Sequence, residues 1–157
     1  MNIKEIDNKI KELQEEIENL KNEKDTLKRW RAEEDEIYYY AISFIANDSE
    51  NNTACDNFRY DTGNYFKTEN EAREYREKLI IYQKLKDLAL ELNQGKQINF
   101  DDTTQEKYII ILDDMRNLNI ISSVYQQSIG QIYCLDKNFL EKAKERIGED
   151  NLEKLFE

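Results

Sequence analysis

Arg59-Tyr-Asp-Thr-Gly-Asn-Tyr-Phe-Lys-Thr-Glu-Asn-Glu-Ala72 is the stretch that decides the fold of this chain. It reads as a strand, a glycine, an aromatic residue and the cap of a helix. Thr68 and Glu71 form a T-x-x-E capping box, in which each side chain accepts a hydrogen bond from a backbone N–H at the helix start. A looser copy follows as Ser128-Ile-Gly-Gln-Ile-Tyr-Cys-Leu-Asp-Lys-Asn-Phe139, with Asp136 as its expected cap. The repeat predicts two similar structural units.

Residues with strong β-propensity precede the first copy. The segment 37–45 is dominated by Tyr, Ile and Phe, and the cluster Asn47-Asp-Ser-Glu-Asn-Asn52 has the composition of a turn. We therefore predict a hairpin whose second strand returns along 54–60. The period-two alternation of strands assigns one set of side chains to the core face: Tyr38, Tyr40, Ile42 and Phe44.

A long helix follows this hairpin. Apolar residues recur at helical spacing over 69–92, and Gly95 offers the left-handed conformation that ends many helices. We expect this helix to cover the first sheet, and we expect Gly63 to serve a backbone turn with positive φ or a close approach. After a polar connection, further patterns predict strands and a helix at 107–112, 118–125, 129–135 and 137–147.

The predicted fold class is α+β. Residues 1–30 form a coiled-coil dimerisation helix, and residues 37–157 form one domain of two tandem antiparallel strand-strand-(strand)-helix units, 37–95 and 107–157. Because internal duplications usually bury a common interior, we expect the two units to share one core.

The N-terminal segment has the heptad pattern of a coiled coil. Isoleucines and leucines alternate by three and four residues, except where Lys24 occupies one position, and isoleucine at a with leucine at d favours two parallel strands. The polar position would fix the register. The expected oligomerisation residues are Ile3, Ile6, Ile10, Leu13, Ile17, Leu20 and Leu27.

The residues that flank this seam agree with a parallel homodimer. Glu16 would face Lys21 of the second copy, and Glu23 would face Lys28. The alternative is an amphipathic helix that packs on its own domain. The narrow stripe of two apolar positions in seven argues against that alternative.

Composition narrows the classes of partner. Formal net charge is −11, and 36% of the residues are charged. Direct nucleic-acid binding needs clustered Lys and Arg, so we expect none, and attraction to a basic protein surface fits better. No apolar run approaches the length of a membrane span, and the first residues lack a signal sequence, so we expect a cytoplasmic protein without membrane contact. Cys55 and Cys134 are expected to be free thiols.

The sequence offers no apparatus for catalysis. It has no histidine, no C-x-x-C pair and no glycine-rich phosphate loop, so we expect neither an enzyme nor a cofactor. Asp101-Asp102 and Asp113-Asp114 present hard oxygen ligands that Mg²⁺ accepts, but adjacent acids beside a strand are more simply explained as turn residues. We therefore expect no metal site.

Two acidic clusters are the candidate partner-binding residues. They are Glu33, Glu34, Asp35 and Glu36 in one segment, and Asp113 and Asp114 in another. Trp30, the single tryptophan, stands next to the first cluster. It is either an anchor that packs the base of the coil against the next domain or an exposed binding hot spot.

The chain resembles a group of small uncharacterised accessory proteins of phages and prophages of low-GC Gram-positive bacteria. The resemblance spans about residues 28–156, and its most specific parts are the Gly-Asn-x-Phe-Lys-Thr-x-x-Glu-Ala block at 63–72 and the closing Ile-Gly-Glu-Asp at 147–150. Cys134 and Leu135 depart from the pattern of that group, which bears on the second helix cap.

The resemblance implies a biological context. Small acidic proteins of this origin frequently bind and block a host factor, and anti-CRISPR and other anti-defence proteins are the prominent class. The expected function is non-enzymatic inhibition in the host cytoplasm, by a homodimer that occupies a basic, nucleic-acid-binding surface of a defence protein, with a CRISPR–Cas effector favoured. The alternative is a phage structural or scaffolding protein that assembles through its coil. An enzyme is a third hypothesis, which the missing general base, nucleophile and cofactor motifs disfavour.

Overall fold

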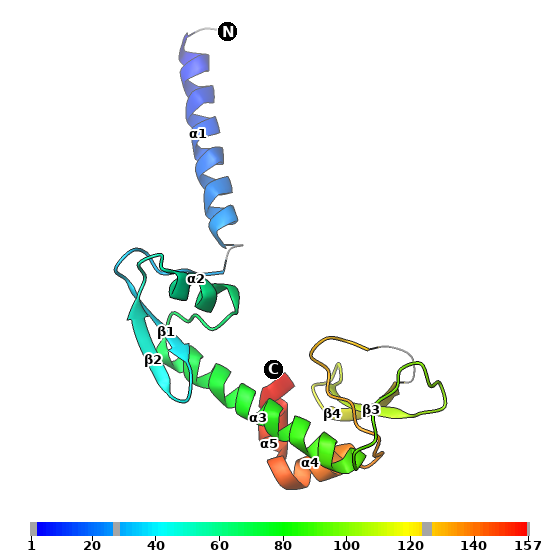
Figure 1. Ribbon diagram of the computed structural model, residues 1–157. Helices are drawn as coiled ribbons and strands as arrows, with labels where there is room; N and C mark the ends of the chain where they lie inside the picture. The colour runs from blue at the N-terminus through cyan, green and yellow to red at the C-terminus, as the bar shows by residue number, and fades with distance from the viewer. Residues whose placement is uncertain (1–2, 27–28, 124–126, 157) are drawn as a thin grey trace. The chain divides into compact units, whose positions relative to one another are not determined.

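A computed structural model describes residues 3–26, 29–123 and 127–156. The elements follow in the order α1, β1, β2, α2, α3, β3, β4, α4 and α5 (Figure 1). The chain divides into two compact units, unit 1 over Met1–Ala72 and unit 2 over Arg73–Glu157. This boundary falls inside a helix, whereas the sequence pattern placed it in the connection 96–106. None of the helices in the described residues is long and apolar enough to cross a membrane.

The N-terminal helix α1 spans Ile3–Thr26, which confirms the expected helix. Its association with a second copy stays a prediction. The described side chains of the seam are exposed, namely Ile6, Ile10, Leu13 and Ile17. Those of Ile3 and Leu20, and Leu27 as a whole, lie outside the described residues.

Unit 1 contains a short hairpin, β1 at Ile37–Ala41 and β2 at Ile45–Ser49. The return strand expected at 54–60 is wrong, because Ala54–Asp61 forms helix α2. Thr53 and Asp56 build a capping box that starts this helix. A threonine followed three residues later by an acid therefore outweighed the β-propensity of the aromatic residues beyond it.

The hairpin turns earlier than expected. Residues 42–44 form the bend between the strands, so Ile42 and Phe44 are exposed instead of facing the core. Tyr38 is fully buried and Tyr40 is half-buried, as the alternation predicted.

Helix α3 spans Glu69–Asn93 and begins at the predicted capping box. Thr68 Oγ1 accepts from the N–H of Glu71 at 3.2 Å, and the Glu71 carboxylate accepts from the N–H of Thr68 at 2.9 Å. The helix was expected to cover the first sheet. Its buried residues Leu85, Leu88 and Ala89 instead belong to the core of unit 2.

Unit 2 contains a second antiparallel hairpin and two helices. The hairpin consists of β3 at Lys107–Leu112 and β4 at Leu118–Ser123, and the helices are α4 at Phe139–Ile147 and α5 at Glu149–Phe156. A third strand at 129–135 is absent from the described residues, where a single bridge joins Tyr108 to Cys134. Asp136 does not cap α4 as expected: the N-cap is Asn138, and Asp136 accepts a hydrogen bond from the N–H of Asn138 at 2.8 Å.

The expected single core is not confirmed. The described apolar residues form two clusters, one within each unit. Tyr38 and Tyr65 dominate the cluster of unit 1, and aliphatic residues with Phe139 dominate that of unit 2. Cys55 is exposed and Cys134 is buried, and both thiols are free as expected.

Candidate functional site

Stacked aromatic rings form the centre of unit 1. Tyr38 of β1 and Tyr65 lie face to face, with ring centroids 3.9 Å apart and planes inclined by 11°. Tyr60 of α2 meets Tyr65 edge-on at 5.5 Å, and Trp30 lies at 5.8 Å from it. These contacts hold the segment that leads into β1 against α2, since offset and edge-on ring pairs add to the gain from burial.

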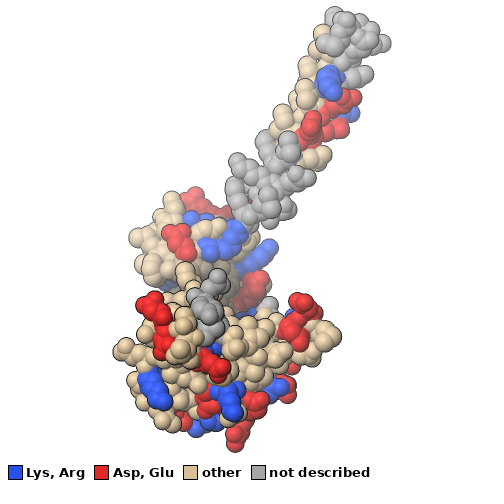
Figure 2. Space-filling model, turned by 90° about the vertical axis from the view of Figure 1, so that its right-hand side faces the viewer, with Lys and Arg blue, Asp and Glu red and all other residues tan. Residues whose placement is uncertain are grey.

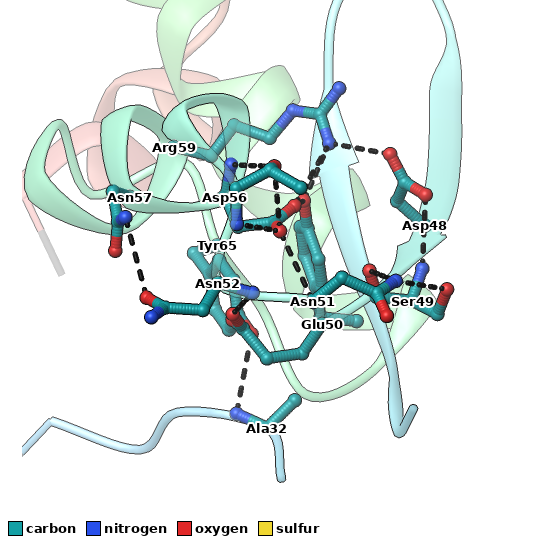
Figure 3. Close-up of polar contacts among 12 residues, drawn as sticks. Ala32, Asp48, Ser49, Glu50, Asn51, Asn52, Asp56, Asn57, Arg59 and Tyr65 are labelled. Carbon is teal, nitrogen blue, oxygen red and sulfur yellow. Dashed lines mark hydrogen bonds and ion pairs between the residues drawn. The ribbon is translucent and has the colours of Figure 1, made fainter. Parts of the chain in front are cut away.

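A buried carboxylate secures the hydroxyl end of Tyr38. Asp56 is 2% exposed, and its Oδ1 accepts from the Tyr38 hydroxyl at 2.6 Å. Its Oδ2 accepts from the N–H and the hydroxyl of Thr53 at 2.9 and 2.7 Å, and from the N–H of Asn51 at 3.2 Å. Arg59 donates to the Tyr38 hydroxyl at 2.5 Å and to Asp48 at 2.9 Å (Figure 3). The network joins both strands to α2.

A second buried carboxylate secures Tyr65. Glu50 is 4% exposed and accepts two hydrogen bonds from Arg31, at 2.9 and 3.1 Å. It also accepts from the Tyr65 hydroxyl at 2.6 Å and from the N–H of Asn52 at 2.7 Å. Arg31 makes a further hydrogen bond to Asn57 at 2.8 Å. A planar guanidinium holds several N–H donors in a fixed fork, so it can serve all these acceptors at once.

These networks do not favour acid–base chemistry. Burial disfavours the charged form of Asp56, but hydrogen bonds from Tyr38, Thr53 and Asn51 outweigh burial and hold the pKa of this carboxyl below its usual range. The hydrogen bond from Arg31 lowers the pKa of Glu50, and burial raises the pKa of Tyr38 and of Tyr65. None of these groups therefore changes protonation near neutral pH, where a general base needs to work.

The acidic segment 33–36 lies at the edge of this framework. It forms a turn in which Asp35 has a φ of 66°, and the N–H of Asp35 donates to the backbone oxygen of Glu50 at 2.9 Å. The carboxylate of Glu36 accepts from the N–H of Glu33 at 2.8 Å. The carboxylates of Glu33, Glu34 and Asp35 are exposed and form no hydrogen bond or ion pair with any residue that the structure describes. We call 33–36 the acidic loop.

An open groove of about 1100 Å³ runs beside the acidic loop. Its other walls are Arg29, Trp30, Arg31 and Tyr60. The guanidinium of Arg29 lies over the ring of Tyr60 at 3.9 Å, and the Tyr60 hydroxyl donates to the backbone oxygen of Arg29 at 2.9 Å. The groove therefore combines an acidic rim with an aromatic wall, and the contacts between Arg29 and Tyr60 hold that wall in position.

The second predicted acidic cluster has a structural explanation. Asp113 Oδ1 accepts from the N–H of Met115 at 2.9 Å and from the N–H of Asn117 at 2.8 Å, which closes the turn between β3 and β4. Asp114 is exposed in the same turn. Asp113 and Asp114 belong to unit 2, and the acidic loop belongs to unit 1. The acidic loop borders this groove, and Asp113 and Asp114 are not among its lining residues.

Outside the acidic loop, the surface carries charges of both signs. On the face shown in Figure 2, acidic and basic side chains are interspersed instead of forming one field of a single sign. No three acidic or cysteine side chains of the described residues gather in a way that could hold a metal ion. The side chain of Asp102, one of the alternative Mg²⁺ ligands, accepts from the N–H and the hydroxyl of Thr104 at 2.9 and 2.7 Å.

Sequence reasoning missed the buried charges of unit 1. The buried carboxylates Asp56 and Glu50, and the partly exposed arginines Arg59 and Arg31 that bind there, were not among the candidates. Thr53-Ala-Cys-Asp56 nevertheless repeats the spacing of the capping box at 68–71. Trp30 is half-buried and both packs on Tyr65 and lines the groove. Its anchoring role is thus supported, and its role as a hot spot stays a prediction.

Comparison of the chain with known protein families, with curated proteins and with solved structures found no match.

Proposed function

We propose that the protein acts by binding, and that the acidic loop and its groove occupy a basic surface of a protein partner. The observation that carries this proposal is the set of three exposed carboxylates at Glu33, Glu34 and Asp35, which have no partner among the described residues. They lie on a turn that the buried Glu50 network holds in place. A preformed acidic rim loses little conformational freedom on binding, which favours affinity.

The aromatic wall supports the same proposal. Trp30 and Tyr60 line the groove next to the carboxylates, and aromatic residues combined with a charged rim are typical of protein interfaces. A nucleic-acid backbone is a poor occupant, because the acidic loop places three exposed carboxylates at this groove, whereas its one exposed cation among the described residues is Arg29.

The biological setting is part of this proposal. We propose that the chain is a phage or prophage accessory protein that inhibits a host defence factor without turnover, with a CRISPR–Cas effector as the favoured target. Support comes from the resemblance carried by residues 63–72 and from the acidic rim. In the structure these residues form a glycine turn, a bridge to β1 and the cap of α3, so the most specific part of the resemblance concerns the framework. The full span of the resemblance, about residues 28–156, also includes the acidic loop.

An inhibition assay tests the proposal. Purified chain is titrated into a DNA-cleavage reaction of a CRISPR–Cas effector loaded with its guide RNA, at low and at physiological salt. We expect inhibition that is complete near one site per effector and weaker at higher salt, since charges at a rim act over a Debye length of about 8 Å. Replacing Glu33, Glu34 and Asp35 by lysine should slow association by about tenfold or more at low salt.

The control is Glu77→Lys, an exposed acid of the other unit that is not among the candidate binding residues. It should leave inhibition unchanged. Inhibition that continues at a substoichiometric ratio, with a chemically modified target, would instead identify an enzyme. Inhibition that depends neither on the salt concentration nor on the substitutions in the acidic loop would show that this surface does not bind the target.

A second candidate function is a phage scaffold or assembly protein. The observation that favours it is the row of exposed isoleucine and leucine side chains along α1, which is suited to assembly. Capture from infected cells separates the two functions. The inhibitor should recover one defence factor, whereas the scaffold should recover virion proteins or further copies of this chain.

A further inference from the structure

Helix α1 carries a row of apolar side chains that the described residues leave uncovered. Ile6, Ile10, Leu13 and Ile17 are 40, 49, 46 and 51% exposed, at successive spacings of four, three and four. All residues from 9 to 19 are exposed as well. An isolated helix of this kind is marginal in water, because most helix stability in proteins comes from burying an apolar face.

We propose that a second copy of the chain covers this face in parallel orientation, and that the protein therefore presents its two acidic loops from the same end of one coil. This inference rests on the proposed function only where it concerns the loops. The dimer itself depends on α1 alone.

The identity of the occupant follows from the pattern of the seam. Ile10 and Ile17 stand at a and Leu13 at d, and this combination packs best in a coil of two parallel strands. The stripe is also narrower than the face of a helix that packs on a globular domain. Because the seam is complementary to itself, the second copy is the partner that always matches it.

The orientation follows from charge. In an antiparallel pair that matches Leu13 with Ile17, the g positions face each other, so Glu16 would lie beside Glu16 of the second copy. In the parallel pair Glu16 faces a basic e position instead, as the sequence predicted. Both arrangements also form pairs of opposite charge, Lys9 with Glu23 and Asp7 with Lys21 in the antiparallel coil, and Glu16 with Lys21 and Glu23 with Lys28 in the parallel one. The repulsion between the two Glu16 carboxylates is the difference that favours the parallel arrangement.

The parallel orientation has a consequence for binding. Helix α1 ends at Thr26 and the acidic loop begins at Glu33, seven residues later, a reach of at most about 25 Å. Both loops are therefore tethered to one end of the coil. In an antiparallel pair they would start from opposite ends of a helix of 24 residues, about 36 Å apart. Two tethered sites raise apparent affinity for an extended basic surface.

Cysteine cross-linking tests the orientation. Cys55 is first replaced by serine, because it is exposed, and Ile6→Cys is then introduced. In the parallel dimer both new thiols share one layer of the coil, and mild oxidation at micromolar concentration should give a disulfide-linked dimer. In the antiparallel pair they would lie about 27 Å apart and would not react. Glu15→Cys, on the outer face of the helix, is the matched control and should stay largely monomeric in a denaturing gel.

Light scattering on the unmodified chain tests the dimer. A monomer at micromolar concentration overturns the proposal. A dimer in which Ile6→Cys fails to cross-link overturns the parallel orientation. Ile10→Asp combined with Ile17→Asp should give a monomer that keeps the Trp30 fluorescence of the intact unit 1.

Binding to surfaces coated with a lysine-rich peptide tests the two-loop arrangement. On a dense coating the dimer should dissociate at least about tenfold more slowly than the Ile10→Asp, Ile17→Asp monomer, and on a sparse coating the two should be equal. Equal dissociation on the dense coating overturns the bivalent arrangement. If neither form binds either coating, the proposed attraction to basic surfaces fails while the dimer stands.

Discussion

Unit 1 and unit 2 share a similar order of backbone features, which we call the backbone plan, and differ in the side chains that form their interiors. In each unit a hairpin is followed by a glycine with positive φ, Gly63 at 79° and Gly130 at 81°. The next residue bonds through its side-chain amide to the first strand of the hairpin: Asn64 to Ala41, and Gln131 to Ile110. A single bridge to the same strand follows in each unit, and the next element along the chain is a helix, α3 after the first bridge and α4 after the second.

The two interiors rely on different physics. Unit 1 buries stacked tyrosines whose hydroxyls bind the carboxylates of Asp56 and Glu50. Unit 2 buries Leu85, Ile110, Phe139 and Leu152, each at most 2% exposed. Directional hydrogen bonds fix the position of the loops they join, whereas apolar packing mainly supplies stability. The difference indicates that the polar interior of unit 1 serves to hold the acidic loop and groove in shape.

The largest effect expected from this comparison is the loss of unit 1 in Asp56→Ala. The substitution leaves the Tyr38 hydroxyl and the N–H groups of Thr53 and Asn51 without their acceptor, and we expect about 4 kcal/mol of destabilisation. Urea unfolding followed by Trp30 fluorescence measures it, because the only tryptophan lies in unit 1. Asp61→Ala, an exposed acid at the end of the same helix, is the matched control and should change little.

The corresponding substitution in unit 2 is Leu152→Ala. Leu152 is fully buried, and its truncation should lower stability by about 3 kcal/mol through lost burial and a residual cavity. Hydrogen exchange of β3 and α4 measures this loss. Leu90→Ala, at a position 62% exposed on α3, provides the control. If Leu152→Ala lowered the stability measured by Trp30 fluorescence as much as that measured by hydrogen exchange of unit 2, the two units would unfold together. That outcome would contradict the separate treatment of their interiors.

The units should also differ in their response to acid. Hydrogen bonds hold the folded-state pKa of Asp56 and of Glu50 below the ordinary values of 3.8 and 4.5. Their stabilising contribution is therefore complete above these values and is lost as pH falls from them toward the depressed folded-state pKa. We expect unit 1 to lose about 2–3 kcal/mol between pH 6 and pH 2.

The aliphatic interior of unit 2 has no buried carboxylate of this kind among its described residues, so its exchange protection should change less over that range. Denaturation midpoints from Trp30 fluorescence, compared with hydrogen exchange of β3, provide the measurement. Equal losses in both units would show that surface charge, and not the buried network, governs the acid response.

The sequence predicted those features that depend on local chemistry. The capping box at Thr68, the helix over 69–92 and the turn at Gly63 follow from side chains close together in the chain. The Tyr38–Asp56 and Arg31–Glu50 hydrogen bonds join residues 18 and 19 positions apart, and no local pattern reveals which donor meets which carboxylate. The acidic loop was found from composition, but its groove depends on Tyr60, which only the fold brings there.

The wrong predictions have physical causes as well. Helix α2 was taken for a strand because Phe58 and Tyr60 have high β-propensity, while the cap at Thr53 decides the conformation. Helix α3 was expected to cover the hairpin before it, but its buried leucines match the apolar side of the hairpin after it. Propensity and periodicity describe the surface that an element buries, and they do not identify the element that covers it.

The smallest expected effect tests the shared plan itself. Gly63→Ala and Gly130→Ala each place a Cβ on a backbone with φ near 80°, which disfavours L residues by about 1–2 kcal/mol. Space is not the obstacle, because the nearest atom to the new Cβ at Gly63 is Arg29 Nη1 at 3.8 Å, and no atom lies within 4 Å at Gly130. The two penalties should therefore agree within a few tenths of a kcal/mol, each read from its own unit by hydrogen exchange. A penalty confined to Gly63 would mean that the repeat in unit 2 tolerates another turn, and the two units would then share an outline without sharing the backbone requirement that defines it.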